Sequence, residues 1–293
     1  MTASPLANPT ATRQMLERFG LATKHRLGQN FLVDDNVIAK ILELARLSPE
    51  SRALEVGPGI GTLTLGMLPH AGSVTSIEAD RELEPVLADL AHEFPSFRYI
   101  MGDALKVGWP DIVAAPAGEP NILVANLPYN VAATIILKYL AERPSLEAAV
   151  VMVQAEVADR ICASPGNKAY GAYTAKLRLY GEVTGRFEVP PTCFMPAPHV
   201  NSAVVRIDRA PAANPETGEP LAPEAIAAAS AVIDAAFAQR RKTIRNSMSA
   251  SGFDKAALDA AFEACGIAPT ARAETLVPED FVRLASVLAT VVV

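Results

Sequence analysis

Five short apolar segments alternate with helix-like segments between residues 53 and 153, and this alternation constrains the fold more than any other feature. The apolar segments are Ala53–Val56, Val74–Ile77, Phe97–Met101, Ile122–Ala125 and Ala148–Val153. The segments with helical spacing are Leu63–Leu68, Glu82–Phe94 and Ala132–Leu140. Strands that alternate with helices form a parallel sheet with helices on both faces, so an α/β fold is predicted.

The flanking residues extend this sheet and add a second region. A helix is predicted from Asp34 or Asp35 to Leu47, and the strands Glu182–Val189 and Ser202–Ile207 are expected to form an antiparallel edge. Residues 209–223 are rich in proline and are predicted to be a linker. The remaining residues contain amphipathic segments, which predict a small all-helical C-terminal domain: Ala225–Phe237, Asp254–Cys265 and Glu279–Ala289.

Charge and cysteine usage exclude several classes of protein. The net charge of -6 argues against a generally basic nucleic-acid binder, so any such role needs a local patch. The three cysteines, Cys162, Cys193 and Cys265, form no CxxC pair, which suggests neither a metal site nor a disulfide framework. A reducing, cytoplasmic setting fits best. No apolar run approaches the length needed to span a bilayer, so no membrane association is expected.

The tetrapeptide Asn126-Leu127-Pro128-Tyr129 follows an apolar strand directly. The lone pair of a nucleobase's exocyclic amine is delocalised into the ring, and hydrogen-bond acceptors aimed at its two N–H bonds draw that lone pair out. Asn126 offers a side-chain carbonyl for this. Pro128 disfavours helical geometry at Leu127 and keeps that peptide exposed in a turn. Tyr129 can stack on the base. An ordinary turn remains the alternative for a motif this short.

Three further features lie at the ends of successive predicted strands. Gly57-Pro58-Gly59-Ile60-Gly61 follows the first strand, where an open α/β sheet binds ligands; the alternative is a tight turn. Glu78 ends the second strand, where an acid can accept hydrogen bonds from both ribose hydroxyls. Asp103 follows the third strand and can accept from an adenine amine. Each acid alone could be a solvated loop residue, but together the three features predict a nucleoside site.

No catalytic serine triad, metal cluster or carboxylate pair accompanies these features in the sequence. Methyl transfer from S-adenosylmethionine fits, because its sulfonium is already a strong electrophile and the enzyme has mainly to position the acceptor. A nicotinamide dehydrogenase is disfavoured, because the glycine spacing is not the G-x-G-x-x-G of dinucleotide binders and no hydride-transfer acid or base is evident.

Several motifs in order resemble those of the ribosomal RNA adenine N6,N6-dimethyltransferases of the KsgA/RsmA type. They are Gly28-Gln29-Asn30-Phe31-Leu32, the Gly57 loop, Glu78, Asp103, the Asn126 tetrapeptide, residues Val189 to Pro198 and the basic segment Ala236 to Thr243. The resemblance implies a Rossmann-like class I methyltransferase fold. It also implies an N-terminal extension over residues 1–23, whose order the sequence leaves open, a catalytic domain over 24–208, a linker over 209–223 and a helical RNA-binding domain over 224–293.

The resemblance also assigns roles to residues. The cofactor would be contacted by Asn30, Leu32, Gly57, Glu78, Asp103 and Asn126. The target adenine would be held by Asn126, Leu127, Pro128 and Tyr129, with Phe194 stacking on the face opposite Tyr129. The reaction implied is dimethylation of two adjacent adenosines near the 3′ end of 16S rRNA in the pre-30S subunit, by a monomer without a metal and with a role in subunit biogenesis.

This sequence departs from the family pattern at two positions that usually carry positive charge near the RNA. Ala155 and His199 stand where lysines are usual in the family, which weakens the expected phosphate contacts. The cluster Arg240, Arg241, Lys242 and Arg245 is the one dense basic run in the sequence. It is predicted to bind RNA phosphates without reading the base sequence, and a solvated helix face is the alternative.

Two other functions share some of these features. The dimethylases of 23S rRNA that confer macrolide resistance have the same asparagine motif, although the Phe194 loop, the basic segment and the C-terminal domain favour the small-subunit enzymes. A ribosome-assembly factor that acts mainly by binding is the second alternative.

Overall fold

The computed structural model describes residues 2–21, 30–114 and 118–291, and the chain divides into two compact units. Unit 1 is made of Met1–Ala158 and Val183–Asp208, and unit 2 of Asp159–Glu182 and Arg209–Val293. Gly28 and Gln29 of the predicted entry motif and the predicted domain start at Lys24 lie outside the described residues.

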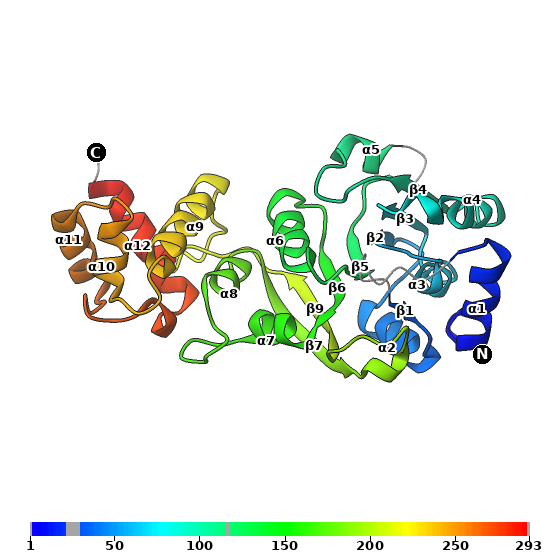
Figure 1. Ribbon diagram of the computed structural model, residues 1–293. Coiled ribbons are helices and arrows are strands. Elements are labelled where there is room, and N and C mark those ends of the chain that lie inside the picture. Colours follow the sequence, from blue (N-terminus) through cyan, green and yellow to red (C-terminus); the bar gives the residue numbers. More distant parts are fainter. Residues whose placement is uncertain (1, 22–29, 115–117, 292–293) are drawn as a thin grey trace. The chain divides into compact units, whose positions relative to one another are not determined.

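A seven-stranded sheet with the order β4-β3-β2-β5-β6-β9-β7 forms the centre of unit 1 (Figure 1). Its strands are β2 Arg52–Val56, β3 Ser73–Glu78, β4 Phe97–Met101, β5 Ile122–Asn126, β6 Ala148–Gln154, β7 Gly181–Val189 and β9 Ser202–Arg209. Strands β2 to β6 pair in parallel, whereas β9 is antiparallel to β6. The prediction of a mostly parallel sheet with an antiparallel edge is confirmed.

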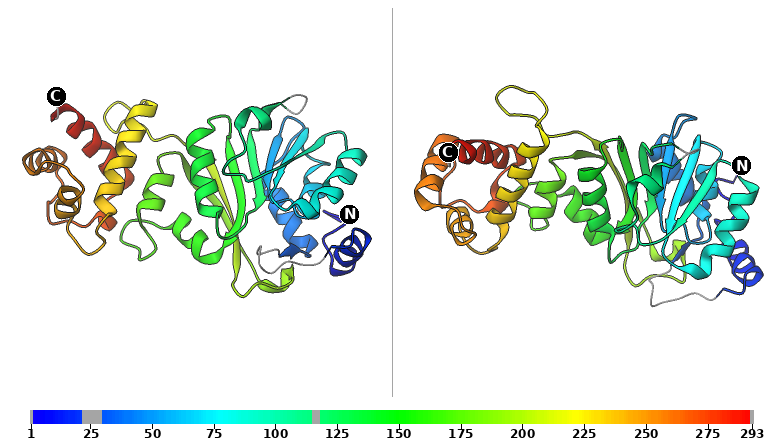
Figure 2. Two further views of the ribbon diagram at one scale, coloured as in Figure 1. Left: turned by 45° about the horizontal axis from the view of Figure 1, so that its top comes forward. Right: turned by 90° about the horizontal axis from the view of Figure 1, so that it is seen from above.

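Helices cover both faces of this sheet. On one face, α2, α3 and α4 pack on strand residues such as Val74 and Val124, and on the other lies α6, as the left view of Figure 2 shows. Leu123, whose side chain points to the face opposite that of Val124, is also fully buried. Parallel strands buried on both faces need near-continuous apolar sequence, which explains the five segments. The helices are α2 Asp35–Ala45, α3 Thr62–Met67, α4 Glu84–Glu93, α5 Trp109–Val113, α6 Ala132–Glu142 and α7 Ala155–Cys162.

The N-terminal residues of unit 1 are folded onto it. Helix α1, Pro9–Arg18, begins at Asn8, whose side-chain oxygen accepts from Ala11 N–H at 2.8 Å. Leu6 and Leu16 are buried in the core shared with α2, α3 and α4. The sequence left the order of this extension open; residues 2–21 are folded, because these side chains bury apolar surface against the sheet helices.

Unit 2 is helical, with α8 Ala172–Leu177, α9 Pro223–Phe237, α10 Ile244–Ala250, α11 Lys255–Cys265 and α12 Pro278–Val291. The yellow-to-red helices α9–α12 gather in one group in both views of Figure 2. Residues 159–182, predicted to be part of the catalytic domain, pack with these helices instead. The reason is contacts within unit 2: Tyr170 O–H donates to the Leu276 carbonyl at 3.0 Å, and Gly166 N–H to the Glu274 carbonyl at 2.8 Å.

Within the described ranges, no helix is long and apolar enough to cross a membrane. Nor does any group of three or more His, Cys, Asp or Glu side chains in those ranges lie close enough to hold a metal ion.

Candidate functional site

The carboxyl ends of four parallel strands meet at one edge of the sheet in unit 1. In spatial order these are β4, β3, β2 and β5, and they are followed or ended by Asp103, Glu78, Gly57 and Asn126. Parallel pairing places such residues side by side although up to 69 positions separate them in the sequence, as for Asn126 and Gly57. This edge is where an open α/β sheet binds its ligands.

A cavity of about 400 Å³ lies at this edge, within the size range of small-molecule sites. It is lined by the six predicted cofactor contacts and by the target-base tetrapeptide: Asn30, Leu32, Gly57, Glu78, Asp103, Asn126, Leu127, Pro128 and Tyr129. Sequence reasoning did not single out Glu55, Thr62, Leu63, Asp80 or Leu83, which also line it.

The loop after β2 requires glycine for its backbone shape. Gly57 has a φ of 73°, in the left-handed region that L side chains rarely adopt. Its N–H donates to the Ile77 carbonyl at 2.9 Å, which joins the loop to β3. A Cβ built at Gly57 would lie 3.6 Å from the Pro128 ring. The glycine loop and the Asn126 loop are therefore neighbours in the cavity wall.

Glu78 is a buried acid whose two carboxylate oxygens are both held by backbone amides. Gly59 N–H donates to Oε2 at 3.2 Å, and Asp80 N–H donates to Oε1 at 2.8 Å. Burial raises the pKa of Glu78 above its usual range, and the backbone amides of Asp80, Gly59 and Ala79 oppose that rise. A carboxylate has about four lone-pair sites, so beside these amides Glu78 can still accept from a ligand hydroxyl.

Asp103 is the more exposed of the two acids, with a side-chain exposure of 47%. Its Oδ1 accepts from Leu105 N–H at 2.9 Å, and its Oδ2 lies 3.5 Å from Lys106 Nζ. These contacts orient the carboxylate of a loop residue that would otherwise rotate in solvent.

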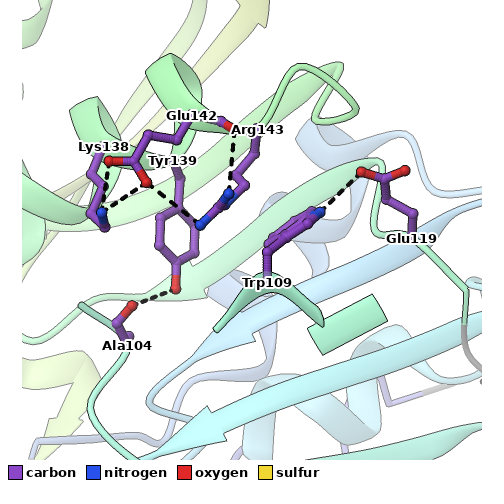
Figure 3. Close-up of polar contacts among 7 residues, drawn as sticks. All are labelled: Ala104, Trp109, Glu119, Lys138, Tyr139, Glu142 and Arg143. Carbon is purple, nitrogen blue, oxygen red and sulfur yellow. Dashed lines mark hydrogen bonds and ion pairs between the residues drawn. The ribbon is translucent and has the colours of Figure 1, made fainter. Parts of the chain in front are cut away.

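Helix α6 holds Ala104, the residue after Asp103, as Figure 3 shows. Tyr139, only 2% exposed, donates its hydroxyl to the Ala104 carbonyl at 2.8 Å. Farther along, the Arg143 guanidinium lies over the Trp109 ring at 4.7 Å, and Trp109 Nε1–H donates to Glu119 at 3.0 Å. The helix that follows the Asn126 loop thereby fixes the neighbouring Asp103 loop as well.

The turn after Asn126 is rigid. Leu127 is 1% exposed, and its N–H donates to the Met152 carbonyl at 3.1 Å. The Pro128 carbonyl accepts from Val131 N–H at 3.1 Å and from Ala132 N–H at 3.0 Å, which starts α6. The Tyr129 hydroxyl lies 2.7 Å from Ser202 Oγ at the start of β9.

Phe194 is not brought to the cavity. It is 4% exposed and packs in the core of unit 1, in the short strand β8 Phe194–Met195. This strand is antiparallel to β1 Phe31–Leu32, with Phe194 opposite Leu32. Of this pair, Leu32 lines the cavity and Phe194 does not.

Comparison with known proteins decides the family. The family described as Ribosomal RNA adenine dimethylase matches residues 20–290. A relative from Thermobifida fusca (strain YX), named Ribosomal RNA small subunit methyltransferase A, is 41% identical over 285 residues, with 96% of this chain and 95% of its own covered. The chain belongs to the ribosomal RNA adenine dimethylase family. The family resemblance that the sequence motifs indicated is confirmed.

Other members of the dimethylase family and solved structures agree. A relative of the same name from Rhodococcus opacus (strain B4) is 42% identical over 286 residues, covering 96% of this chain and 94% of its own. A dimethyladenosine transferase from Plasmodium falciparum has a TM-score of 0.71 at 23% identity, covering 87% of this chain and 95% of that one, which supports the fold. The 23S rRNA methyltransferase ErmE has a TM-score of 0.66 at 28% identity, covering 89% and 100%. The predicted enzyme class, an S-adenosylmethionine-dependent rRNA methyltransferase, is confirmed.

One buried acid in the cavity of this dimethylase was missed by sequence reasoning. Glu55, in β2, is 1% exposed, and its Oε2 accepts from Thr64 Oγ1 at 2.6 Å and from Ser76 Oγ at 2.7 Å. Burial raises the pKa of Glu55 to about 7, more than the two hydroxyls lower it. The sequence signal that could have found Glu55 is its position as a charged residue inside the otherwise apolar run Leu54-Glu55-Val56.

The predicted RNA-binding residues belong to unit 2. Arg240, Arg241 and Lys242 are exposed in the segment between α9 and α10. Arg245 differs, because its guanidinium forms a two-pronged ion pair with Asp259, with Nε to Oδ1 at 2.5 Å and Nη2 to Oδ2 at 2.6 Å. Three of the four basic side chains are thus directed to solvent, and the fourth joins α10 to α11.

Proposed function

We propose that this protein transfers methyl groups from S-adenosylmethionine to N6 of two adjacent adenosines near the 3′ end of 16S rRNA, making each a dimethyladenosine. The observation that carries the proposal is the shared cavity of Asn126, Glu78 and Asp103 at the ends of three strands. Family membership and the printed name of the relatives, Ribosomal RNA small subunit methyltransferase A, support the small subunit as the source of the substrate.

The residues of the cavity fit the methyl donor. Glu78, oriented by the backbone amides of Gly59 and Asp80, would accept from the ribose hydroxyls, and Asp103 from the adenine amine. Gly57 would let the backbone approach the donor closely, with Asn30 and Leu32 covering it. When bound, S-adenosylmethionine supplies a methyl group on a positively charged sulfur, which is a strong electrophile.

The Asn126 loop would prepare the target amine. The Asn126 side-chain carbonyl and the Leu127 backbone carbonyl would accept from its two N–H bonds and orient the nitrogen lone pair toward the donor. Because Leu127 is buried and the Pro128 carbonyl accepts from Ala132, the first residue of α6, these acceptors are held in place before the base arrives. The amine proton becomes acidic once the nitrogen is methylated, and it can leave to water.

Tyr129 would stack on one face of the adenine, and Phe194 on the other. Phe194 can do so only if its side chain leaves the core of unit 1, where it is 4% exposed. The variant Phe194→Leu tests this part of the proposal, since it keeps an apolar side chain but removes the ring. A large loss of kcat with little loss of thermal stability supports stacking. Small losses of both kcat and thermal stability assign Phe194 to the core alone.

We propose further that the enzyme acts as a monomer in the cytoplasm on the pre-30S subunit. Arg240, Arg241 and Lys242 of unit 2 would contact phosphates of the structured RNA, and Arg245 would do so only at the expense of its pair with Asp259.

Mass spectrometry of rRNA after incubation with the enzyme and S-adenosylmethionine tests the reaction. Dimethyladenosine is expected in 16S rRNA of immature small subunits with the natural protein and is expected to be absent with Asn126→Ala, whose thermal unfolding should be unchanged. Full activity of Asn126→Ala would overturn the assigned role.

The second candidate is methylation of 23S rRNA, which the similarity to ErmE at 28% identity favours. Purified 16S- and 23S-containing particles offered in parallel as methyl acceptors separate the two candidates. Product in the large subunit alone would replace the proposal with this one.

A further inference from the structure

The N-terminal segment of unit 1, residues 2–21, touches the three helices that follow walls of the cavity. The family match begins at residue 20, so most of this segment lies outside it. Helix α2 follows β1 with Leu32, α3 follows the glycine loop, and α4 follows Asp80 and Leu83. A segment that reaches all three helices is placed to set the shape of the cavity.

Two contacts fix the first residues of the segment to α2. Ala3 N–H donates to Asp35 Oδ2 at 3.0 Å, and Ser4 N–H donates to Asp35 Oδ1 at 2.8 Å. Asp35 is the first residue of α2, and Asp34 already caps that helix, so the Asp35 carboxylate is available to the segment. At the other end of the segment, Arg18 forms an ion pair with Asp89 of α4 at 3.1 Å.

The third contact reaches the cavity wall itself. Ser4, only 2% exposed, donates its hydroxyl to the Thr62 carbonyl at 2.7 Å. Thr62 lines the cavity and is the first residue of α3. The Ser4 hydroxyl therefore holds a backbone atom of a residue that forms part of the site.

The start of α3 is buried but lacks a side-chain cap. Its N-cap residue is Gly61, with a φ of 87°, which offers no side-chain cap, and the helix is only 6 residues long. Glycine has the largest backbone freedom of any residue, so a loop ending in Gly61 loses much entropy on ordering. An external hydrogen bond to Thr62 reduces the freedom that donor binding would otherwise have to remove.

We infer that Ser4 is a positioning residue for the methyl-donor half of the cavity, acting through the Thr62 carbonyl. This inference rests on the proposed use of S-adenosylmethionine at that site. It assigns the N-terminal segment a part in donor binding in addition to its packing on unit 1.

Full-length Ser4→Ala tests it, with isothermal titration of the reaction product S-adenosylhomocysteine and steady-state kinetics on small subunits. The Kd for S-adenosylhomocysteine and the KM for the donor are expected to rise about fivefold, the equivalent of one ordinary hydrogen bond. The kcat at saturating donor and the KM for RNA should stay within twofold.

Asn8→Ala is the matched control. It removes two hydrogen bonds of the N-terminal segment, one accepted from Ala11 N–H and one donated to the Pro5 carbonyl, and neither touches a cavity residue. It is expected to lower the thermal midpoint as much as Ser4→Ala does, with an unchanged Kd.

An unchanged Kd in Ser4→Ala overturns the inference, and so does an equal rise in both variants, which would show a loss of stability alone. Failure of the natural protein to bind S-adenosylhomocysteine would instead overturn the proposed function, so the two failures are distinct.

Discussion

The hydroxyl of Tyr129 lies 2.7 Å from Ser202 Oγ and joins the loop after β5 to the first residue of β9. Ser202 is fully buried and opposes Gln154 of β6, so its position is set by the sheet. The proposed stacking ring is thus oriented by a strand that begins 73 positions later in the chain.

Removing either hydroxyl should free the ring without emptying the core. We expect Ser202→Ala and Tyr129→Phe each to lower kcat/KM for RNA about fivefold, because an ordinary hydrogen bond contributes about 1 kcal/mol. The double variant should be no worse than either single one, since both break the same contact. The Kd for S-adenosylhomocysteine is the internal control and should not change. Additive losses would show that the two hydroxyls act separately.

Glu55 should make stability depend on pH near neutrality. Burial raises its pKa from an ordinary 4.5 to about 7, so between these values the folded protein binds more protons than the unfolded chain. The contribution of Glu55 is fully present below pH 4.5 and is lost as the pH rises through 7. The free energy of unfolding should fall by about 3 kcal/mol over this window. Glu55→Gln has an amide oxygen that can still accept from Thr64 and Ser76. Denaturant titrations of this variant should show that the fall of the unfolding free energy between pH 4.5 and 7 is gone. An unchanged slope would place the titration on another group.

The strands were predictable because burial on both faces leaves little choice of residue. Ile122–Ala125 was predicted and β5 is Ile122–Asn126, and Phe97–Met101 was predicted and observed without change. Strand order in space is a different matter. That β2 lies between β3 and β5 depends on pairing across the sheet, which apolar spacing does not record.

The parts that were missed depend on contacts between distant residues. The N-terminal segment is fixed by backbone N–H groups of Ala3 and Ser4 on Asp35, and no side-chain pattern reports a backbone donor. Residues 159–182 follow a sheet strand in sequence, yet Tyr170 buries its ring among the helices of unit 2. Phe194 matched its motif, but whether a matching aromatic faces the cavity or the core is decided by packing.

Tyr139 should affect donor binding through the Asp103 loop (Figure 3). Burial raises its pKa to about 12, so the hydroxyl is protonated at neutral pH and donates to the Ala104 carbonyl. Tyr139→Phe keeps the ring and leaves a buried carbonyl without this donor, which should cost about 1 to 2 kcal/mol of stability. The KM for S-adenosylmethionine should rise severalfold, because Asp103 precedes Ala104.

The control for Tyr139→Phe is Lys138→Ala on the same helix. It removes a partly exposed ion pair with Glu142 at 2.7 Å, and such pairs are worth about 0.5 kcal/mol. Thermal unfolding and donor titration of both variants should separate the two residues. A similar change of KM in both would contradict a specific link between α6 and the Asp103 loop.

The basic residues of unit 2 should divide into two groups by their effect on RNA binding. Exposed Arg240, Arg241 and Lys242 are proposed phosphate contacts, and each contact released by substitution lowers the salt dependence of binding by roughly 0.7 to 0.9 in the log-log slope. The triple variant with glutamine should therefore bind small-subunit RNA more weakly at low salt, with a slope smaller by about 2 to 3. Arg245→Gln should leave the slope unchanged, because that guanidinium is paired with Asp259. Filter binding at several salt concentrations measures both. If Arg245→Gln alone reduced the slope, the ion pair with Asp259 would have to open on the RNA, and the exposed trio would be only a solvated surface.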